Sequence, residues 1–386
     1  MSMKYQRQIG TFVESAPGGE RVSAFVPTAL PPDPPLDIGD FLYLLERAAT
    51  AVGRLDGISE SLPLGSPPLK PIYNAKEALL SSQIEGTQST LDDIFLFDKE
   101  KERSESDDLQ EVFNLSEAIE HGLRRIREDD FPLCLRLLRE MHKILLSSGR
   151  GATKQPGEFR SSQNWIGGTR PGNAVFVPPP PDRLHECLGD FERFLHNEEP
   201  NMTPLIKAGL AHLQFETIHP FLDGNGRLGR GLITLILCES GMLKEPILYL
   251  SRFFKSHLDD YYRLLQETRR TGAWEVWMEF FLNGVAQTAE QASKSASQII
   301  AIFEADRKAI RDRLGRSAPS ALNVHEEMQR RPITTASLVA SELKISYPTA
   351  QSALENLVKI EIAHKTEGKR PGQHYVYSKY YDLLLE

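Results

Sequence analysis

The chain has 386 residues, of which 40% are hydrophobic and 25% are charged, and its formal net charge at pH 7 is −8. This composition is typical of an ordinary globular protein of two or three domains, and the negative charge gives no overall basic surface for nucleic acid. No apolar run reaches the ~20 residues that a membrane span needs, and the N-terminal MSMKYQRQIG lacks the apolar core of a signal peptide.

The first 38 residues are rich in proline and have no periodicity. Their segment PTALPPDPPLD predicts extended chain that wraps a surface rather than building a core. From about residue 38 to residue 98 the pattern becomes helical. One predicted helix has an apolar face made of Phe41, Leu42, Leu44 and Leu45, and a second runs from Pro71 into NAKEALLSSQIEG. We take residues 1–105 as an N-terminal arm followed by helices.

The middle of the chain has a helical pattern almost throughout. Apolar residues recur at helical spacing, and the predicted helices cover residues 107–128, 132–148, 181–196, 202–218, 226–241, 253–269 and 273–315. Only Asn173 to Pro178, in PGNAVFVPPPP, looks extended, and we expect a short β-hairpin there. The pattern predicts a mostly α domain over residues 106–316.

The last part of the chain, residues 317–386, has a different pattern. ITTASLVASELK and SYPTAQSALENLVKIE predict two short helices joined by a tight turn, and AHKTEGKRPGQHYVYSKY predicts two strands around a Gly/Pro-rich tip. A helix-turn-helix followed by a hairpin is the outline of a winged helix. The predicted fold is therefore mostly α, a helical bundle with a short β-hairpin flap, followed by an α+β winged helix-turn-helix.

The segment from His219 to Arg230, HPFLDGNGRLGR, lies between two strongly apolar predicted helices. Gly224 and Gly226 leave backbone N–H groups open to a close ligand, and the start of the next helix adds more, which together make an anion site. Arg227 and Arg230 stand in the first turn of that helix without any acid, although helix starts disfavour cations. Because the two arginines are three residues apart and project from one face, we expect them to clamp a polyphosphate.

The remaining polar residues of the segment suggest chemistry on that phosphate. Asp223 beside phosphates predicts Mg²⁺, which prefers one or two carboxylates together with phosphate oxygens. His219 can accept a proton near neutral pH. A base beside a magnesium-bound polyphosphate indicates that a hydroxyl group attacks phosphorus.

HPFLDGNGRLGR matches the signature of Fic domains at every defined position: His-Pro-Phe, any residue, Asp or Glu, Gly-Asn-Gly-Arg, any two residues, Arg. The resemblance covers roughly residues 70–285. The proline-rich arm and the C-terminal winged helix make nearly the whole chain similar to large bacterial Fic proteins. The resemblance implies a Fic helical bundle that performs protein adenylylation (AMPylation), in which AMP moves from ATP to a Tyr, Thr or Ser hydroxyl of a target protein.

The resemblance also implies a role for each residue of the segment. His219 would be the general base, Asp223 would hold Mg²⁺, and Arg230 would bind the γ-phosphate. The implied nucleotide-binding residues are Gly224, Asn225, Gly226, Arg227, Leu228, Gly229, Arg230 and Tyr262. Tyr262 matches the region that lines the adenine pocket in similar proteins, although an amphipathic helix explains it as well. NAVFVPPP matches the family's flap, which holds a target by β-augmentation, although a surface loop with a proline-rich exit explains it equally well.

A second motif, SSQIEG, lies N-terminal to the core. Gly86 suits a residue just past a helix end, and Glu85 then stands in the last turn, where an anion opposes the macrodipole. Ser81, Glu85 and Gly86 match the inhibitory motif of Fic proteins, Ser/Thr-x-x-x-Glu-Gly/Asn. The resemblance implies that Glu85 pairs with Arg230, occupies the γ-phosphate site and inhibits the enzyme.

Other functions remain open on the sequence. One alternative is a DNA-binding regulator with an ATP-sensing Fic domain, which the predicted winged helix favours. Residues 332–386, however, carry 6 Lys+Arg and 6 Asp+Glu. This neutral balance argues against tight nucleic-acid binding. Similar folds also transfer UMP, phosphocholine or phosphate, and some relatives use the inhibitory glutamate to remove AMP. We also expect self-modification and a homodimer.

The cysteines bear on where the protein works. Cys134, Cys187 and Cys238 are scattered and have no metal-binding spacing. We therefore expect reduced, mostly buried thiols. The sequence thus predicts a cytoplasmic protein without membrane contact.

Overall fold

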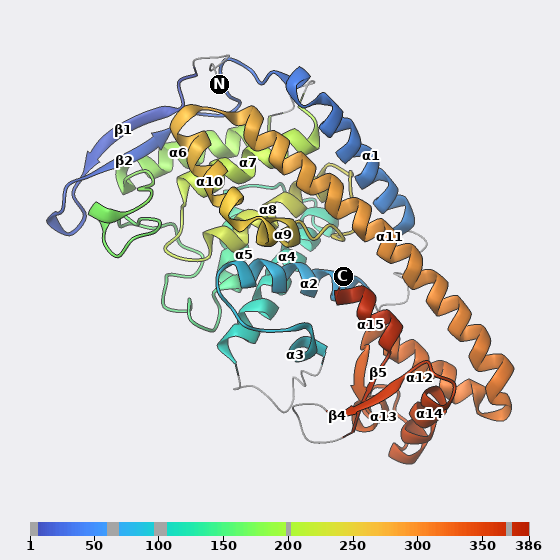
Figure 1. Cartoon of the computed structure of the whole chain (residues 1–386). Coiled ribbons are helices and arrows are strands. Elements are labelled where there is room, and N and C mark those ends of the chain that lie inside the picture. Colours follow the sequence, from blue (N-terminus) through green and yellow to red (C-terminus); the bar gives the residue numbers. More distant parts are fainter. Residues whose placement is uncertain (1–6, 60–68, 96–105, 198–201, 368–372, 386) are drawn as a thin grey trace.

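The computed structural model describes residues 7–59, 69–95, 106–197, 202–367 and 373–385. Helices dominate it, and the expected mostly α fold is confirmed (Figure 1). The helices are α1 (Leu42–Ser59), α2 (Leu69–Ile84), α3 (Leu91–Phe95), α4 (Asp107–Glu128), α5 (Leu135–Leu145), α6 (Pro181–Leu195), α7 (Pro204–Ile218), α8 (Asn225–Glu239), α9 (Ser251–Ser256), α10 (Leu258–Thr271), α11 (Trp274–Leu314), α12 (Ala318–Arg330), α13 (Ala336–Glu342), α14 (Tyr347–Lys359) and α15 (Ser378–Leu385). The strands are β1 (Gly10–Ser15), β2 (Val22–Pro27), β3 (Ile333–Thr335), β4 (His364–Glu367) and β5 (Gln373–Val376).

Helices α7 and α8 form the centre of the bundle. Both are buried on nearly every side, which follows from their apolar residues facing all directions rather than one stripe. Thr203 caps α7 by accepting a hydrogen bond from the N–H of Ile206, and Pro204 occupies the first helical position. Helices α4, α5, α6 and α11 pack around this pair. The loop between α7 and α8 is therefore held by two rigid elements.

Helix α1 packs along α11, the long orange helix that runs from the bundle to the C-terminal elements (Figure 1). Phe41 and Leu45 are buried against the core, as expected, but Leu42 is 47% exposed. The prediction for Leu42 was wrong because successive helical residues are about 100° apart, and the stripe that faces α11 continues from Leu45 at intervals of three and four.

One segment that was predicted as a single helix, residues 253–269, is two helices. Helix α9 ends at Ser256 and α10 begins at Leu258. His257 between them has φ −126° and ψ 42°, which is not a helical conformation. The break redirects the chain, so that α10 reaches the loop between α7 and α8.

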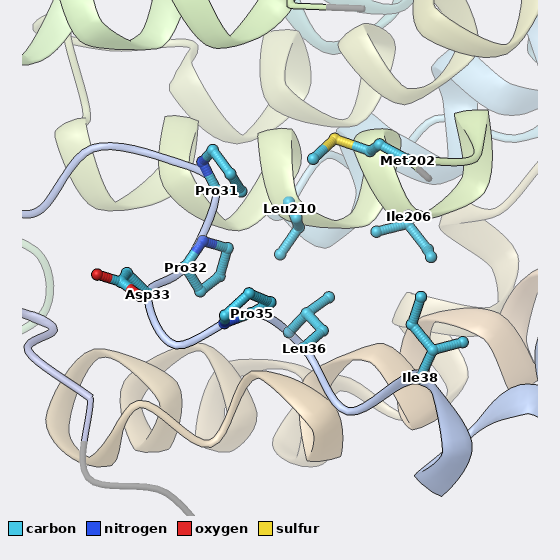
Figure 2. Close-up of a pocket in the computed structure, with 9 residues that line it drawn as sticks. All are labelled: Pro31, Pro32, Asp33, Pro35, Leu36, Ile38, Met202, Ile206 and Leu210. Carbon is cyan, nitrogen blue, oxygen red and sulfur yellow. The ribbon is translucent and has the colours of Figure 1, made fainter. Parts of the chain in front are cut away.

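The N-terminal arm contains a β-hairpin that its sequence did not predict. Strands β1 and β2 pair antiparallel, and the N–H of Phe25 in β2 donates to the carbonyl of Val177. Beyond the hairpin, the proline-rich segment lies across α7 as expected. Figure 2 shows Pro31, Leu36 and Ile38 facing Met202, Ile206 and Leu210 across an apolar pocket of about 330 Å³.

The segment from Asn173 to Pro178 is not a regular hairpin. A single antiparallel bridge joins Ile166 to Phe176, and a 3-10 turn covers Pro171–Asn173. Prolines follow directly from residue 178 to residue 181, and because proline has no N–H, a longer ladder cannot form there. The expected flap is a loop closed by one bridge.

The C-terminal elements include the predicted helix pair, α13 and α14, and the predicted hairpin, β4 and β5. The sequence did not predict α12, β3 or α15. Strand β3 completes an antiparallel sheet with the order β3-β5-β4. The Gly/Pro-rich tip, which contains Lys369 and Arg370, lies outside the described residues.

These C-terminal elements contact the N-terminal helices. Tyr381 of α15 donates a hydrogen bond to Asp92 of α3, and its ring packs edge-on against Phe95 at a centroid distance of 6.4 Å. Helix α12 contacts α2, and β3 contacts α3. In the part of the chain that the structure describes, none of the helices combines the length and the apolar character needed to cross a membrane.

Candidate active site

The loop from His219 to Gly224 is fixed by its own backbone and side chains. His219 ends α7 in the left-handed region, with φ 49°, and its N–H donates to the carbonyl of Phe215 at 2.8 Å. Gly224 precedes α8 with φ +76°, which favours glycine. Asn225 exchanges two hydrogen bonds of 2.9 Å with the backbone of Phe221. The side chain of Asn225 therefore holds the loop together, and only its backbone is available to an anion.

Arg160 supports this loop, and no feature of its local sequence predicted that role. Its side chain is buried, and its Nε donates to the carbonyl of His219 at 2.9 Å. Its Nη1 donates to the carbonyl of Ser162 at 3.2 Å, and its backbone N–H donates to the carbonyl of Pro220 at 3.0 Å. Arg160 thereby joins the α7–α8 loop to the segment that leads into the flap.

A cavity of about 420 Å³ opens beside the loop. Five residues that the sequence singled out line it, and they are Glu85, His219, Gly226, Arg230 and Tyr262. The flap contributes Ile166 and Val175 to the same wall. The cavity lining does not include Asp223 or Arg227, and Leu228 is fully buried in the core.

Arg230 is the most strongly held of these residues. Its Nη2 donates to Oε1 of Glu85 at 2.7 Å and to the carbonyl of Ser81 at 2.9 Å, and its Nε donates to Oγ of Ser81 at 2.8 Å. Its side chain is 2% exposed and that of Glu85 is 37% exposed. Burial acts to lower the pKa of Arg230, but the charge and the hydrogen bond of Glu85, together with Tyr261 and Glu216, outweigh burial, and the net shift is upward.

Gly226 makes room for the carboxylate of Glu85. A Cβ atom at Gly226 would collide with Oε1 of Glu85, so a larger residue here would displace this carboxylate. The carboxylate lies at the first turn of α8, where backbone N–H groups and the helix dipole favour an anion. The negative charge that Arg230 lacked in its own helix is thus supplied by Glu85, which directly follows α2.

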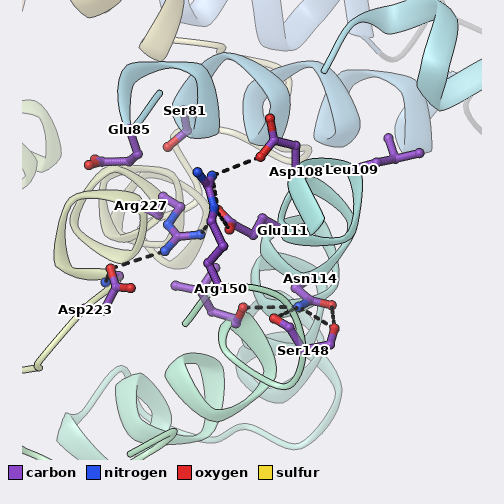
Figure 3. Close-up of polar contacts among 12 residues, drawn as sticks. Ser81, Glu85, Asp108, Leu109, Glu111, Asn114, Ser148, Arg150, Asp223 and Arg227 are labelled. Carbon is purple, nitrogen blue, oxygen red and sulfur yellow. Dashed lines mark hydrogen bonds and ion pairs between the residues drawn. The ribbon is translucent and has the colours of Figure 1, made fainter. Parts of the chain in front are cut away.

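Arg227 belongs to a separate network, which Figure 3 shows. Its Nη1 donates to Oε2 of Glu111 in α4 at 2.9 Å, and its Nη2 lies 3.5 Å from Oδ1 of Asp223. Glu111 also accepts from Arg150, which contacts Asp108. The two arginines therefore have different partners and do not form one clamp in this structure. Glu111 was missed because it has the appearance of an ordinary acid in an amphipathic helix.

His219 is a neutral imidazole in this site. Burial, and after it the positive charges of Arg269 and Arg160, lower its pKa to about 3. A neutral imidazole at pH 7 has a nitrogen lone pair that can accept a proton. Arg269 was not predicted from the sequence, although it lines the cavity and lies over the ring of Phe176 at 4.2 Å.

Asp223 is the residue that the sequence assigned to a metal. Its side chain is 40% exposed, and its Oδ1 accepts from the N–H of Gly224 at 2.6 Å. Among the described residues, no three His, Cys, Asp or Glu side chains are grouped as a metal cage. A single, partly exposed carboxylate fits an ion such as Mg²⁺ that takes its other ligands from phosphate and water.

Two family matches cover much of the chain. Residues 42–124 match the N-terminal domain of the Fic/DOC family, and residues 132–237 match the Fic/DOC family domain itself. Curated relatives named protein adenylyltransferase Fic are 32% identical over 162 residues in Culex quinquefasciatus and 29% identical over 216 residues in Nematostella vectensis. These matches cover 42% and 54% of this chain, and 29% and 47% of the relatives. The chain thus spans less than half the length of these relatives.

Solved structures share the fold. A Fic family protein from Desulfovibrio desulfuricans G20 aligns over 88% of this chain and 96% of its own, with a TM-score of 0.55 and 22% identity. Fic-1 from C. elegans aligns over 67% of this chain and 72% of its own, with a TM-score of 0.50 and 20% identity. At these identities the likeness shows a common fold.

Proposed function

The chain is a member of the Fic/DOC family, and from that premise we propose that it is a protein adenylyltransferase that moves AMP from ATP to a Tyr, Thr or Ser hydroxyl of a target protein. The observation that carries this proposal is the meeting of His219, Gly226 and Arg230 in one cavity. The names of the curated relatives support the same activity. The neutral imidazole of His219 takes the hydroxyl proton, while the α8 N-terminus and Arg230 hold phosphate oxygens.

We further propose that Glu85 inhibits the enzyme. Its carboxylate has the hydrogen-bonding partner and the helix N-terminus that the γ-phosphate of ATP requires. Both anions cannot occupy that position, so Glu85 either leaves or forces the nucleotide into a pose that is unsuited to in-line attack. Ser81 keeps Arg230 in place in either case, because its two contacts do not involve the carboxylate.

Asp223 is the proposed magnesium ligand. Asp223 would hold Mg²⁺ together with phosphate oxygens, and the ion would supply charge neutralisation at the phosphates. The carboxylate of Asp223 is oriented by the N–H of Gly224, which places it at the phosphate end of α8. We expect Asp223→Ala to weaken the dependence of activity on magnesium concentration, and an unchanged magnesium titration would remove Asp223 from this role.

Intact-mass measurement tests the reaction class. The full chain and its Glu85→Gly variant are incubated with ATP and Mg²⁺, alone and with a cell lysate. Addition of one AMP to the chain or to a lysate protein, absent with His219→Ala, supports adenylyl transfer. Addition of phosphate or of another nucleotide from a mixture would assign the fold to a different transfer.

Removal of AMP is a second candidate activity, because Glu85 and His219 line the same cavity. A carboxylate there can position a water molecule for attack on an AMP-modified side chain. Incubation of an AMP-modified target with the unmodified full chain, without ATP, tests it. Release of AMP that depends on Glu85 supports this activity, and a stable modified target excludes it.

A further inference from the structure

Glu216 is a buried acid in the last turn of α7 to which the reaction described above gives no role. Its Oε2 lies 3.8 Å from Nδ1 of His219, three residues further along the chain. Neither Nδ1 of His219 nor Oε1 of Glu216 has a hydrogen-bond partner among the described residues. Buried polar atoms in native proteins almost always have partners. The oxygen nearest to Nδ1 is Oε2 of the same carboxylate, and the backbone of Glu216 also acts on the imidazole of His219. The buried carboxylate and the imidazole are therefore close enough to share a role.

Gly229 shows that α8 reserves space for this carboxylate. A Cβ atom at Gly229 would stand 2.6 Å from Oε1 of Glu216, closer than any side chain allows. Gly229 is not among the positive-φ residues, so it is not needed for an unusual backbone conformation. Its lack of a side chain instead lets the carboxylate sit between α7 and α8.

We propose that Glu216 is a positioning residue that holds the imidazole of His219 through Nδ1, so that Nε2 is presented as the proton acceptor. This proposal rests on the proposed adenylyl transfer. In that step the target oxygen forms a bond to the α-phosphorus, the bond from α-phosphorus to the bridging oxygen breaks, and pyrophosphate leaves. The hydroxyl proton moves to Nε2, while Nδ1–H remains directed at Glu216. The carboxylate then stabilises the imidazolium that results.

The surroundings of Glu216 make its charge sensitive to pH. Burial raises its pKa to about 7, Arg230 acts in the opposite direction, and Glu85 adds to the increase. The other titratable and charged groups facing the pair are Arg160, His212, Tyr261 and Arg269. Only the ionised carboxylate stabilises an imidazolium. The rate of transfer should therefore rise with pH through about 7, as Glu216 loses its proton.

A different role for Glu216 would be to balance the charge of two buried arginines. Arg269 donates to the backbone carbonyl of Glu216 at 2.9 Å, and both Arg269 and Arg230 are affected by its charge. Under that role, removal of the acid would disturb the arginines and lower the affinity for ATP. It would not change which nitrogen of His219 carries the proton. The two roles thus differ in ATP affinity and in the tautomer.

The test uses the full chain with Glu85→Gly, to which Glu216→Gln or Glu216→Ala is added. Glu77→Gln serves as the matched control, because Glu77 is a buried acid that also interacts with Arg230 but contacts Ser251 rather than His219. The measurements are the rate of AMP transfer against pH, the equilibrium affinity for ATP, and the ¹⁵N NMR signals of the His219 ring. The ring signals are assigned by their loss in His219→Ala.

We expect Glu216→Gln to lower the rate about 100-fold, to remove the rise through pH 7 and to leave ATP affinity unchanged. Its amide oxygen can still accept from Nδ1–H, so the tautomer is retained, whereas Glu216→Ala mixes the tautomers and lowers the rate further. An unchanged rate, or a loss of ATP affinity that matches the loss of rate, would overturn the proposal. The same loss with Glu77→Gln would do so too. If the Glu85→Gly parent transfers no AMP, the proposed function fails, and the ¹⁵N signals of the Ala variant alone decide whether Glu216 positions His219.

Discussion

At the scale of single residues, His219 separates proton transfer from nucleotide binding. Its backbone N–H and carbonyl are used by Phe215 and Arg160, whereas its ring faces the cavity. We expect His219→Ala to lower AMP transfer by about 10²–10⁴-fold, the contribution typical of general acid–base catalysis, while ATP binding stays nearly intact. Single-turnover transfer and equilibrium ATP binding measure the two effects. Full transfer by the variant would remove His219 as the base.

The second prediction concerns the ion pair between Arg230 and Glu85. Glu85→Gly removes the carboxylate from Arg230 but leaves both contacts of Ser81, so the guanidinium stays in place for a phosphate. An enclosed Arg–carboxylate pair can contribute a few kcal/mol, and each 1.4 kcal/mol is about tenfold in population. We expect transfer to increase about 10- to 100-fold, measured as initial rate with saturating ATP.

The matched variants are Arg230→Ala and its combination with Glu85→Gly. Arg230→Ala deletes the inhibitory pair and the phosphate contact together, so it should not activate. The double variant should be as poor as Arg230→Ala alone, because Glu85 acts through the arginine. If Glu85→Gly leaves both the rate and the nucleotide pose unchanged, SSQIEG is only a helix end.

The functional residues of the α7–α8 segment could be predicted from the sequence, whereas the residues that hold them in place, Arg160 and Glu111, could not. His219, Gly226 and Arg230 are within twelve residues of one another, so one short segment contains them all. Arg160 lies 59 residues before His219, and Glu111 lies 116 residues before Arg227. Nothing in the local sequence of either support distinguishes it from a surface charge, because the partner comes from a distant element.

At the scale of elements, α2 is anchored by an acid in its middle. Glu77 is buried and accepts hydrogen bonds from the hydroxyl and the N–H of Ser251 at the start of α9. Burial raises its pKa to about 7, and the bonds to Ser251 act in the opposite direction. Glu77 therefore keeps its proton in the folded protein at pH values where the unfolded chain has released it. Ionisation of Glu77 should loosen α2, the helix that directly precedes Glu85.

The raised pKa of Glu77 predicts how the free energy of unfolding depends on pH. Because the folded pKa is raised above the unfolded value, the contribution of Glu77 is fully present below pH 4.5 and is lost as pH rises to about 7. A shift of this size corresponds to about 3 kcal/mol. Relative to the unmodified chain, Glu77→Gln should gain about that much in free energy of unfolding between pH 4.5 and 8. Urea unfolding of both chains at several pH values measures the difference, and parallel curves would contradict it.

The elements that the sequence predicted well are those with a strong helical pattern. α4 was expected at residues 107–128 and has those bounds, since Ser106 caps it and acids occupy its first turn. β1 and β2 were missed because GTFVES and VSAFVP alternate weakly and are stabilised by pairing with each other. The break at His257 also escaped prediction, because the apolar pattern continues across it.

At the scale of the whole molecule, the C-terminal elements cover part of α11 and α3. Tyr377 donates to Asp306 at 2.6 Å, and the ring of Tyr380 packs on Phe303 at 4.9 Å. The described residues beyond Gly315 contribute nothing to the cavity of His219. We propose that this part selects the partner and that the preceding residues perform the chemistry.

Truncation tests that division. Residues 1–316 should retain self-modification or transfer to a generic acceptor and should lose the cognate target. The midpoint of thermal unfolding should fall, because Phe303 and neighbouring apolar residues of α11 become exposed, at about 1.5–3 kcal/mol for each large side chain. Scanning calorimetry and transfer assays on both chains measure the two effects. A folded truncated chain without any ATP-dependent activity would show that the division is wrong.

Gly226 limits which substitutions could relieve the proposed inhibition by Glu85 during evolution. The Cα atom of Gly226 lies beside the carboxylate of Glu85. On the proposed function the γ-phosphate takes the same position, so we expect a side chain at residue 226 to weaken inhibition and nucleotide binding together. Arg230 likewise serves both anions. A genetic screen for variants with increased AMP transfer should therefore recover substitutions at Glu85, in α2 and at residues that pack against α2. It should recover none in the first two turns of α8.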